Sequence, residues 1–188
     1  MIAWLNSPRP ANRRFLLLDR DGVLNANRPD YVKNLDEVRF YQDSLEALKL
    51  LNLNDTGVIL VSNQSGINRG LIRWDDFWEM HEGIIKEVEK HGGSIQAAFY
   101  CPHRPDEKCL CRKPAPAMIL AACRFAGIDP GQTYFIGDNE SDMKAAANAG
   151  CPGIRICRCA DAAARTDVCT PGKPYFESLL DAVLSICR

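Results

Sequence analysis

Short apolar runs alternate with longer stretches of helical spacing along this chain of 188 residues. A short apolar run that ends at glycine or polar residues is typical of a buried strand, and apolar residues three and four apart predict a helix. Strands are expected at 15–18, 58–61, 95–100, 133–136 and 154–156, and helices at 44–53, 75–91, 114–127, 143–149 and 176–186. Residues 1–14 are expected to form an irregular leader.

The alternation of strands and helices predicts an α/β fold, a single Rossmann-like three-layer domain with a parallel sheet and helices on both faces. The domain is expected to span residues 1–188, with its core at 15–157. Residues 22–42 have no regular period and contain turn-forming residues, so we expect a flap there. The stretch between the first two strands is too short for a full cap domain, and the fold is therefore expected to be capless.

Polar side chains follow three of the predicted strands where each strand ends. Asp19 and Asp21 follow the first, Ser62 and Asn63 end the second, and Asp138 follows the fourth. Parallel strands present their carboxyl ends at one edge, where α/β proteins bind ligands. Residues two apart in a strand share a face, so the first two carboxylates can point into one crevice, where Mg²⁺ would relieve their repulsion. Two solvated aspartates are the alternative interpretation of this pair.

These side chains are suited to phosphoryl transfer. One carboxylate can attack phosphorus and form an aspartyl-phosphate, while the second protonates the leaving oxygen and then activates water. Lys113 and the cation would hold the equatorial oxygens, where the charge lies. The alternative for Lys113 is a solvated surface lysine.

Four segments together resemble the motifs of the haloacid dehalogenase-like phosphatases, in order and spacing: Asp19-Arg20-Asp21-Gly22, Ser62-Asn63, Lys113 and Gly137-Asp138-x-x-x-Asp142. The resemblance covers residues 15–157 and implies Asp19 as the nucleophile and Asp21 as the general acid and base. It implies that Ser62 and Lys113 hold the phosphate, and that Mg²⁺ binds to Asp19, the backbone carbonyl of Asp21 and Asp138. Asp142 would be an outer contact of this site or, equally, a carboxylate at a helix N-terminus.

A second cluster lies in the loop 101–111, which reads C-x-H-x5-C-x-C through Cys101, His103, Cys109 and Cys111. Three thiolates and one imidazole suit a structural Zn²⁺ site with tetrahedral geometry. The alternative is a loop with incidental free thiols, although unpaired cysteines are usually buried and this loop is polar. Four protein ligands would close the site, so zinc would fold the loop and fix the start of Arg112 and Lys113.

The remaining cysteines and histidines are expected to bind no metal. Plain thiols are expected at Cys123, Cys151, Cys157, Cys159, Cys169 and Cys187, with no assigned role for the last five. His81 and His91 are expected to face solvent or to cap a helix.

Two groups within the family resemble this chain. The run Asn63-Gln64-Ser65-Gly66-Ile67-Asn68-Arg69-Gly70, with Tyr31-Val32 and Cys101-Pro102-His103, resembles the heptose-1,7-bisphosphate 7-phosphatases. The five residues between His103 and Cys109 are similar to the zinc loop of histidinol-phosphate phosphatase domains. We give more weight to the run beside the active site, because loops tolerate insertions and deletions.

The heptose resemblance implies removal of the C7 phosphate of D-glycero-D-manno-heptose 1,7-bisphosphate, a step of carbohydrate metabolism that supplies lipopolysaccharide biosynthesis. It implies substrate contacts by Asn27, Arg28, Pro29, Asp30, Ser62, Asn63, Gln64, Ser65, Arg112 and Lys113. Arg69 and Arg112 are candidates for binding the distal anionic group, with a plain surface charge as the equal alternative for Arg69.

Charge and composition narrow the partners. The net charge of −1 gives no global field that would attract nucleic acid or an acidic membrane, and no apolar run is long enough to cross a bilayer. We therefore expect a cytoplasmic monomer that uses Mg²⁺ and Zn²⁺ and acts on a small phosphorylated sugar. Histidinol phosphate is the alternative substrate, and a catalytically silent zinc-stabilised binding module is the alternative of another class.

Overall fold

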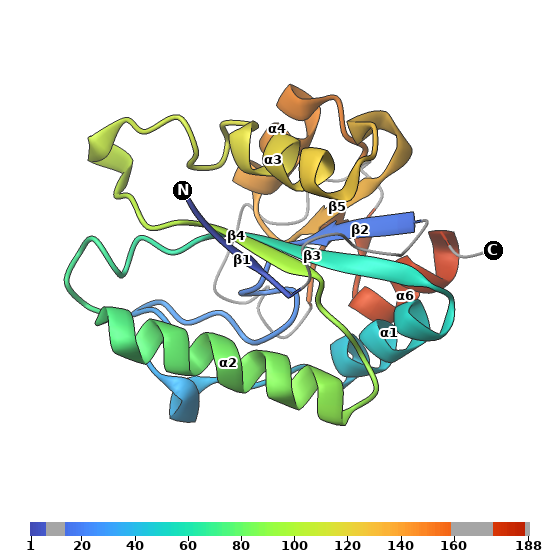
Figure 1. Cartoon of the computed structure of the whole chain (residues 1–188), viewed down its shortest axis with the longest axis horizontal. Coiled ribbons are helices and arrows are strands. Elements are labelled where there is room, and N and C mark those ends of the chain that lie inside the picture. Colours follow the sequence, from blue (N-terminus) through green and yellow to red (C-terminus); the bar gives the residue numbers. More distant parts are fainter. Residues whose placement is uncertain (7–13, 159–174, 187–188) are drawn as a thin grey trace.

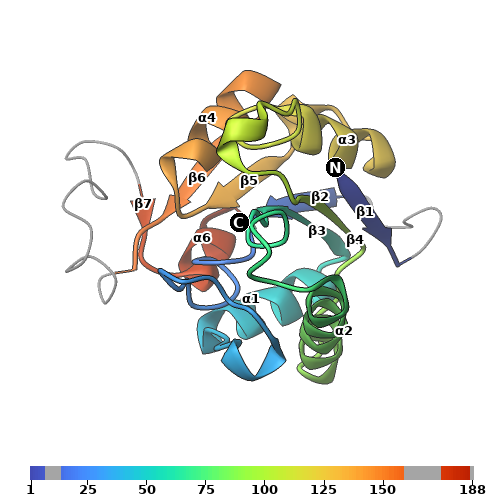
Figure 2. The same ribbon diagram turned by 90° about the vertical axis from the view of Figure 1, so that its left-hand side faces the viewer.

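One seven-stranded sheet organises the chain (Figures 1 and 2). The computed structural model describes residues 1–6, 14–158 and 175–186. The strand order is β1-β4-β3-β2-β5-β6-β7, and every neighbouring pair is parallel except β1 with β4. The strands are β1 (Ile2–Leu5), β2 (Arg14–Leu18), β3 (Thr56–Asn63), β4 (Ala97–Cys101), β5 (Tyr134–Gly137), β6 (Gly153–Ile156) and β7 (Tyr175–Phe176).

Helices cover both faces of the sheet. Figure 1 shows α1 (Gln42–Leu53), α2 (Trp74–Lys90) and α6 (Leu179–Ile186) on one face, and α3 (Ala117–Ala126) and α4 (Glu140–Ala149) on the other. Side chains of a strand alternate between faces, so Leu16 and Leu18 of β2 join the first core while Phe15 and Leu17 join the second. The expected three-layer α/β fold with a mostly parallel sheet is confirmed.

The chain changes direction across the sheet at β2. From β2 it builds β3 and β4 on one side, then crosses over to build β5 and β6 on the other side. The crevice outside the carboxyl end of such a strand is the usual ligand site of open α/β sheets. Asp19 follows β2 directly, and its backbone N–H donates to the Ile136 carbonyl of β5 at 2.9 Å.

Both ends of the described chain differ from the sequence expectation. Residues 2–5 form β1, which pairs antiparallel with β4 from Ile2 opposite Tyr100 to Leu5 opposite Ala97, so the expected irregular leader is wrong there. This half-exposed edge strand forms because it pairs with β4, and not because of the pattern of apolar residues in its own sequence. Residues 7–13 of the expected leader lie outside the described residues. The expected helix at 176–186 begins only at Leu179, after the short strand β7.

Two buried polar side chains find partners inside the protein. Tyr41 occupies the N-cap position of α1, and the buried Ser44 hydroxyl in its first turn donates to the Val23 carbonyl at 2.7 Å. His81 of α2 is buried rather than solvent-facing, and its Nδ1 lies 2.9 Å from the Tyr100 hydroxyl.

The segment between β2 and α1 is an irregular flap with one 3-10 turn at Leu35–Glu37, as the missing period predicted. Across the described parts of the chain, no helix combines the length and the apolar character that a membrane span requires.

Candidate active site

A cleft of about 650 Å³ opens at the carboxyl edge of the sheet. The structure brings most of the predicted site residues to its walls: Asp19, Asp21, Asn27, Arg28, Pro29, Ser62, Asn63, Gln64, Ser65, Arg112, Lys113, Asp138 and Asp142. Asp30 and Arg69 are not among the lining residues. The cleft therefore joins strand ends that are far apart in the sequence, as the parallel sheet predicted.

Lys113 lies at the centre of the buried charges. Its Nζ is 2.9 Å from Asp19 Oδ2 and 2.7 Å from Asp142 Oδ1, and it donates to the Val61 carbonyl at 2.9 Å. Burial alone would lower the pKa of Lys113, but the two carboxylates raise it above its ordinary value, with Asp142 the stronger. The lysine is therefore a fixed cation beside Asp19, and the alternative of a solvated surface lysine is wrong.

Three carboxylates crowd this point. Asp19, Asp138 and Asp142 each offer an oxygen within 4.8 Å of the others. The pKa of Asp19 is raised to about 7. Burial is the largest cause, Lys113 acts against it, and the neighbouring Asp142 and Asp138 carboxylates add to the increase. Hard divalent cations bind such oxygen sets and remove the repulsion between them, so the donor set fits Mg²⁺.

Asp142 combines the two roles that the sequence left open. Its Oδ2 accepts a hydrogen bond from the Asn139 backbone N–H at 3.0 Å, while its Oδ1 pairs with Lys113. The Asn139 side chain in turn accepts from the Ser141 N–H at 3.2 Å and caps α4. Asp142 is thus both a helix N-terminal carboxylate and the residue that fixes Lys113.

Asp21 is held by three neighbouring side chains. Arg20 donates to both of its oxygens, at 3.0 and 2.8 Å, Asn25 donates to Oδ1 at 2.8 Å and Gln64 to Oδ2 at 2.9 Å. Burial would raise the pKa of Asp21, but the Arg20 charge and these hydrogen bonds outweigh it and hold the pKa below its usual range. The Asp21 side chain keeps 21% of its surface exposed, toward the cleft that it lines.

Two glycines allow the carboxylates to approach. Gly22 has a φ of +83°, and a Cβ there would lie 2.3 Å from Asp138 Oδ2. A Cβ on Gly137 would lie 2.4 Å from the Asp142 Cβ. Both distances are far below a van der Waals contact, so only glycine fits at either position.

Comparison with known proteins gives the family. Residues 110–182 match the family described as HAD-hydrolase-like. The chain is 37% identical over 145 residues to the D-glycero-beta-D-manno-heptose-1,7-bisphosphate 7-phosphatase of Pseudomonas aeruginosa, covering 77% of this chain and 82% of that relative. This chain belongs to the haloacid dehalogenase-like phosphatases.

Solved structures of the family agree with this assignment. The D,D-heptose 1,7-bisphosphate phosphatase of Bordetella bronchiseptica, crystallised with magnesium and phosphate, has a TM-score of 0.83 at 32% identity, covering 93% of this chain and 98% of that one. The D,D-heptose 1,7-bisphosphate phosphatase of Burkholderia thailandensis has a TM-score of 0.68 at 28% identity, covering 93% and 99%.

In this phosphatase, the residues that end and follow β3 mainly support the site. The Asn63 side chain binds the backbone of Lys113 twice, donating to its carbonyl at 3.2 Å and accepting its N–H at 3.1 Å. Ser62 is buried and hydrogen-bonds the Asp19 carboxylate. The Ser65 hydroxyl lies 3.4 Å from the Tyr31 hydroxyl, which joins this loop to the flap.

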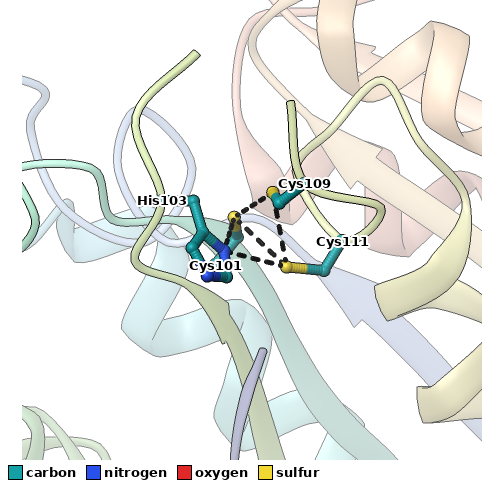
Figure 3. A group of neighbouring side chains, drawn as sticks. All are labelled: Cys101, His103, Cys109 and Cys111. Carbon is teal, nitrogen blue, oxygen red and sulfur yellow. Dashed lines mark hydrogen bonds between the residues drawn. The ribbon is translucent and has the colours of Figure 1, made fainter. Parts of the chain in front are cut away.

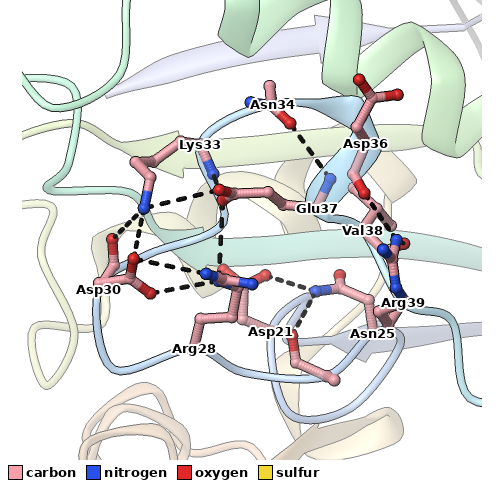
Figure 4. Close-up of polar contacts among 11 residues, drawn as sticks. Asp21, Asn25, Arg28, Asp30, Lys33, Asn34, Asp36, Glu37, Val38 and Arg39 are labelled. Carbon is pink, nitrogen blue, oxygen red and sulfur yellow. Dashed lines mark hydrogen bonds and ion pairs between the residues drawn. The ribbon is translucent and has the colours of Figure 1, made fainter.

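The flap carries its own network of charges (Figure 4). The Arg28 Nε lies 3.2 Å from Asp30 and 3.7 Å from Glu37, and Lys33 pairs with the same Asp30 carboxylate. The Lys33 and Arg28 side chains lower the pKa of Asp30 to about 2, with Lys33 the stronger. Arg28 therefore lines the cleft with part of its charge already paired, while Asp30 faces its flap partners.

The zinc-loop side chains converge as the spacing predicted (Figure 3). The Cys111 Sγ lies 3.4 Å from Cys101, 3.7 Å from Cys109 and 3.3 Å from His103 Nδ1. A tetrahedral site with Zn–S bonds of about 2.3 Å separates its sulfurs by about 3.8 Å, and a disulfide needs about 2.05 Å. These three thiols are free, and the four side chains form a group that could hold a metal ion.

Arg112 and Asn68 hold the loop 101–111 through hydrogen bonds. The Arg112 side chain donates to the His103 carbonyl at 3.1 Å, and the Asn68 amide donates to Glu107 at 3.0 and 3.2 Å. Arg69 is exposed, and its charge lowers the pKa of Asp106 in this loop after the larger effect of Arg104. Arg112 thus both lines the cleft and supports the loop.

One wall of the cleft was missed by sequence reasoning. Ile156, Cys157 and Arg158 line it. The Arg158 guanidinium stacks 3.5 Å from the Tyr41 ring centre and pairs with Asp43 at 2.8 Å. These residues end or follow the strand expected at 154–156, so the strand-end rule applied to the fifth strand would have found them.

The remaining cysteines follow the expectation only in part. Cys123 and Cys151 are buried free thiols. Cys157 is disulfide-bonded, so the expected plain thiol is wrong at that position. Cys159, Cys169 and Cys187 lie outside the described residues.

Proposed function

We propose that this phosphatase removes the C7 phosphate of D-glycero-D-manno-heptose 1,7-bisphosphate. The observation that carries the chemistry is the contact between Lys113 and Asp19 inside the carboxylate cluster, because it pairs a nucleophile with a cation for the phosphoryl oxygens. The names of the relatives at 36–38% identity support the choice of substrate.

The reaction proceeds in two steps. An oxygen of Asp19 attacks phosphorus and the bond to the sugar oxygen breaks. Asp21, whose pKa Arg20 keeps low, first takes up a proton from solvent and then gives it to that leaving oxygen. Asp21 then takes a proton from water as the water oxygen attacks the aspartyl-phosphate, which releases inorganic phosphate and restores Asp19. Lys113 and Ser62 hold the phosphoryl oxygens through both steps, and Lys113 is already in place because Asp142 and Asn63 fix it.

Mg²⁺ would be held by Asp19, Asp138 and the backbone carbonyl of Asp21. When bound, it would neutralise charge on the phosphoryl oxygens. Asp142 is better suited to hold Lys113, because both of its oxygens already have partners within the protein.

The walls of the cleft would bind the sugar and its second phosphate. Asn27, Arg28 and Pro29 of the flap line the same cleft as Arg112 and Ser65, so Arg28 and Arg112 would supply the cations for a distal anionic group. Asp30 and Arg69 stay as predicted contacts that would need a different flap or loop position, because neither lines the cleft.

The test measures phosphate release with Mg²⁺ from heptose bisphosphate, and compares Asp19→Asn with the exposed control Asp75→Asn on α2. We expect loss of at least about 10³-fold in kcat for the first variant and wild-type activity for the second. Comparable turnover by Asp19→Asn would overturn the nucleophile assignment. No release by the wild type from a broad panel of phosphomonoesters would favour the silent binding module.

Histidinol phosphate is the second candidate substrate, because the five residues between His103 and Cys109 match the loop length of that group. The ratio of kcat/KM for the two substrates, measured on one preparation, decides between them. A ratio that favours histidinol phosphate would replace the heptose assignment while leaving the chemistry intact.

Zn²⁺ is proposed as the resident ion of Cys101, His103, Cys109 and Cys111. One equivalent of zinc is expected on metal analysis of the purified protein. Cys109→Ser should lose it and lower the Tm, whereas Cys123→Ser, on the buried face of α3, should retain it. Zinc retained by Cys109→Ser would contradict the ligand set.

The protein is further proposed to be a cytoplasmic monomer of one domain, spanning 1–188 with a core at 15–157 and the zinc loop at 101–111, which acts on no nucleic acid or membrane. A single cooperative unfolding transition and a monomer mass by light scattering are expected.

A further inference from the structure

Gln64 follows β3 and contacts both Asp21 and Cys101, the first residue of the proposed zinc loop. Its side chain is buried, and its backbone N–H donates to the Cys101 carbonyl at 2.7 Å. The side-chain Nε2 donates to Asp21 Oδ2 at 2.9 Å and to Ser62 Oγ at 3.1 Å. Gln64 therefore links the proposed acid and base to the proposed phosphate holder.

Arg20 fixes the orientation of this amide. Its Nη2 donates to Gln64 Oε1 at 3.0 Å and to Asp21 Oδ2 at 2.8 Å, and the residue is only 1% exposed. A guanidinium only donates hydrogen bonds and a carboxylate only accepts them. In a flipped Gln64 amide, the NH2 group would therefore face the Arg20 donors and the carbonyl oxygen would face the Asp21 carboxylate. The orientation of Gln64 is thus set by its two charged neighbours.

No donor of Gln64 remains for a substrate. Both N–H bonds of its amide are used within the protein, on Asp21 and Ser62. Arg20 does not line the cleft, but it contacts Asp21 and Gln64, which do. These contacts differ from the substrate contact that the sequence implied for Gln64.

We infer that Gln64, oriented by Arg20, is a positioning residue. It holds the Asp21 carboxylate at a fixed position relative to the Ser62 hydroxyl, and hence relative to the phosphoryl group that Ser62 would bind. It acts on the proton-transfer steps and not on substrate binding. This inference rests on the proposed function, because it assigns Asp21 the transfer of the proton. Neutral hydrogen bonds from a buried amide can hold a side chain to the fraction of an ångström that proton transfer needs.

The experiment compares two leaving groups in the first turnover. A sugar alkoxide needs a proton from Asp21, whereas p-nitrophenolate is a stable anion that leaves without one. Gln64→Met keeps the length and removes both donors. For this variant we expect the first turnover of heptose bisphosphate to slow by about 10- to 100-fold. The first turnover of p-nitrophenyl phosphate, measured as a burst of p-nitrophenolate, should keep its wild-type rate. Steady-state turnover of both substrates should fall, because the second step also uses Asp21.

A double-mutant cycle tests whether Gln64 acts through Asp21. Adding Gln64→Met to Asp21→Asn should cost no further activity, because the residue that it positions can no longer transfer a proton. Gln132→Met, the same change at an exposed site before β5, is the matched control and should behave as wild type in every assay. Thermal unfolding of each variant shows whether the fold is retained.

Three outcomes would overturn the inference. A raised KM with unchanged kcat would make Gln64 a substrate contact, and equal slowing of both first turnovers would make its role structural. Additive losses in the double mutant would mean that it acts independently of Asp21. If Gln64→Met does not fold, Gln64→Asn, which keeps the amide but cannot span the same distance, is expected to give the same leaving-group pattern. Absence of heptose bisphosphate turnover in the wild type would count against the proposed function instead.

Discussion

At the scale of single residues, the site depends on buried charges that compensate one another. Lys113 forms ion pairs with Asp19 and Asp142, and all three side chains are largely shielded from water. Removing one member of a buried ionic group leaves the others uncompensated, which costs far more than the group contributes as a whole. The residues proposed to perform the chemistry are therefore also a source of instability if altered singly.

Replacing Lys113 by Met tests this balance. In Mg²⁺-free buffer we expect Lys113→Met to lose about 3 kcal/mol of unfolding free energy, because two buried carboxylates lose their cation. Activity should fall by at least about 10²-fold, because the phosphoryl oxygens lose a fixed positive charge. Urea denaturation and phosphate release are the measurements. Lys86→Met, at an exposed position of α2, is the control, and equal stability of the two variants would contradict the argument.

His81 makes a second prediction at this scale. Burial lowers the pKa of His81 to about 4, with a smaller contribution from the Arg20 charge, against an ordinary value of about 6.5. The unfolded chain therefore binds more protons than the folded chain between those values, so stability must fall as the pH falls from about 6.5 toward 4. We expect a loss of about 2 kcal/mol from this residue between pH 7.5 and 5.

The variant His81→Gln removes the titration while offering a hydrogen bond to the Tyr100 hydroxyl. Urea denaturation at several pH values should give a smaller loss of stability on acidification for the variant than for the wild type. Parallel curves for the two proteins would show that His81 does not contribute to the pH dependence.

At the scale of elements, the site depends on how closely strand ends and helix starts approach. The turn after β2 passes directly against Asp138 at the end of β5, and β5 passes against the first turn of α4. The two contacts place Asp19, Asp138 and Asp142 at one point, and each needs a residue without a side chain.

Gly22→Ala is predicted to abolish Mg²⁺-dependent activity. Its Cβ would overlap Asp138 Oδ2, and its φ of +83° is strained for alanine by about 1–2 kcal/mol. Gly127→Ala at the end of α3 is the matched control, because its φ is +68° but no atom lies within 4 Å of the added Cβ. The control should lose stability only. Mg²⁺ titration of phosphatase activity distinguishes the two, and an active Gly22→Ala enzyme would contradict the close approach.

At the scale of the whole molecule, the antiparallel strand β1 covers one edge of the sheet. It pairs with β4 along its length, and Trp4 packs edge-on against His81 with ring centres 4.6 Å apart. An uncovered edge offers free backbone groups to other chains. The strand that the sequence did not reveal thus protects the sheet and part of its core.

Deleting residues 1–6 is expected to lower the Tm by about 5 °C and to promote association, because β4 becomes the exposed edge. The folded fraction should retain its kcat, since none of the proposed catalytic residues lies on β1 or β4: Ser62 ends β3, and Asp19, Asp21 and Lys113 lie in loops that follow strands. Differential scanning calorimetry and light scattering are the measurements. An unchanged Tm with no association would show that β1 contributes little.

The sequence by itself determined the order of strands and helices between residues 15 and 156, the carboxylates at the strand ends and the spacing of the cysteines and histidine in the loop 101–111. Each follows from local rules, namely the period of apolar residues, the shared edge of parallel strands and the ligand geometry of a metal. Asp19, Asp21 and Cys101 could be found this way because their neighbours in the sequence are also their neighbours in the site.

Only the tertiary structure decided which partner each polar side chain takes. The double role of Asp142, the orientation of Gln64 and the stacking of Arg158 on Tyr41 depend on contacts between segments far apart in the chain. The strand β1 likewise exists because β4 offers it an edge. No local period encodes such pairings, because a hydrogen bond or an ion pair depends on the distance between atoms after folding and not on their separation along the sequence.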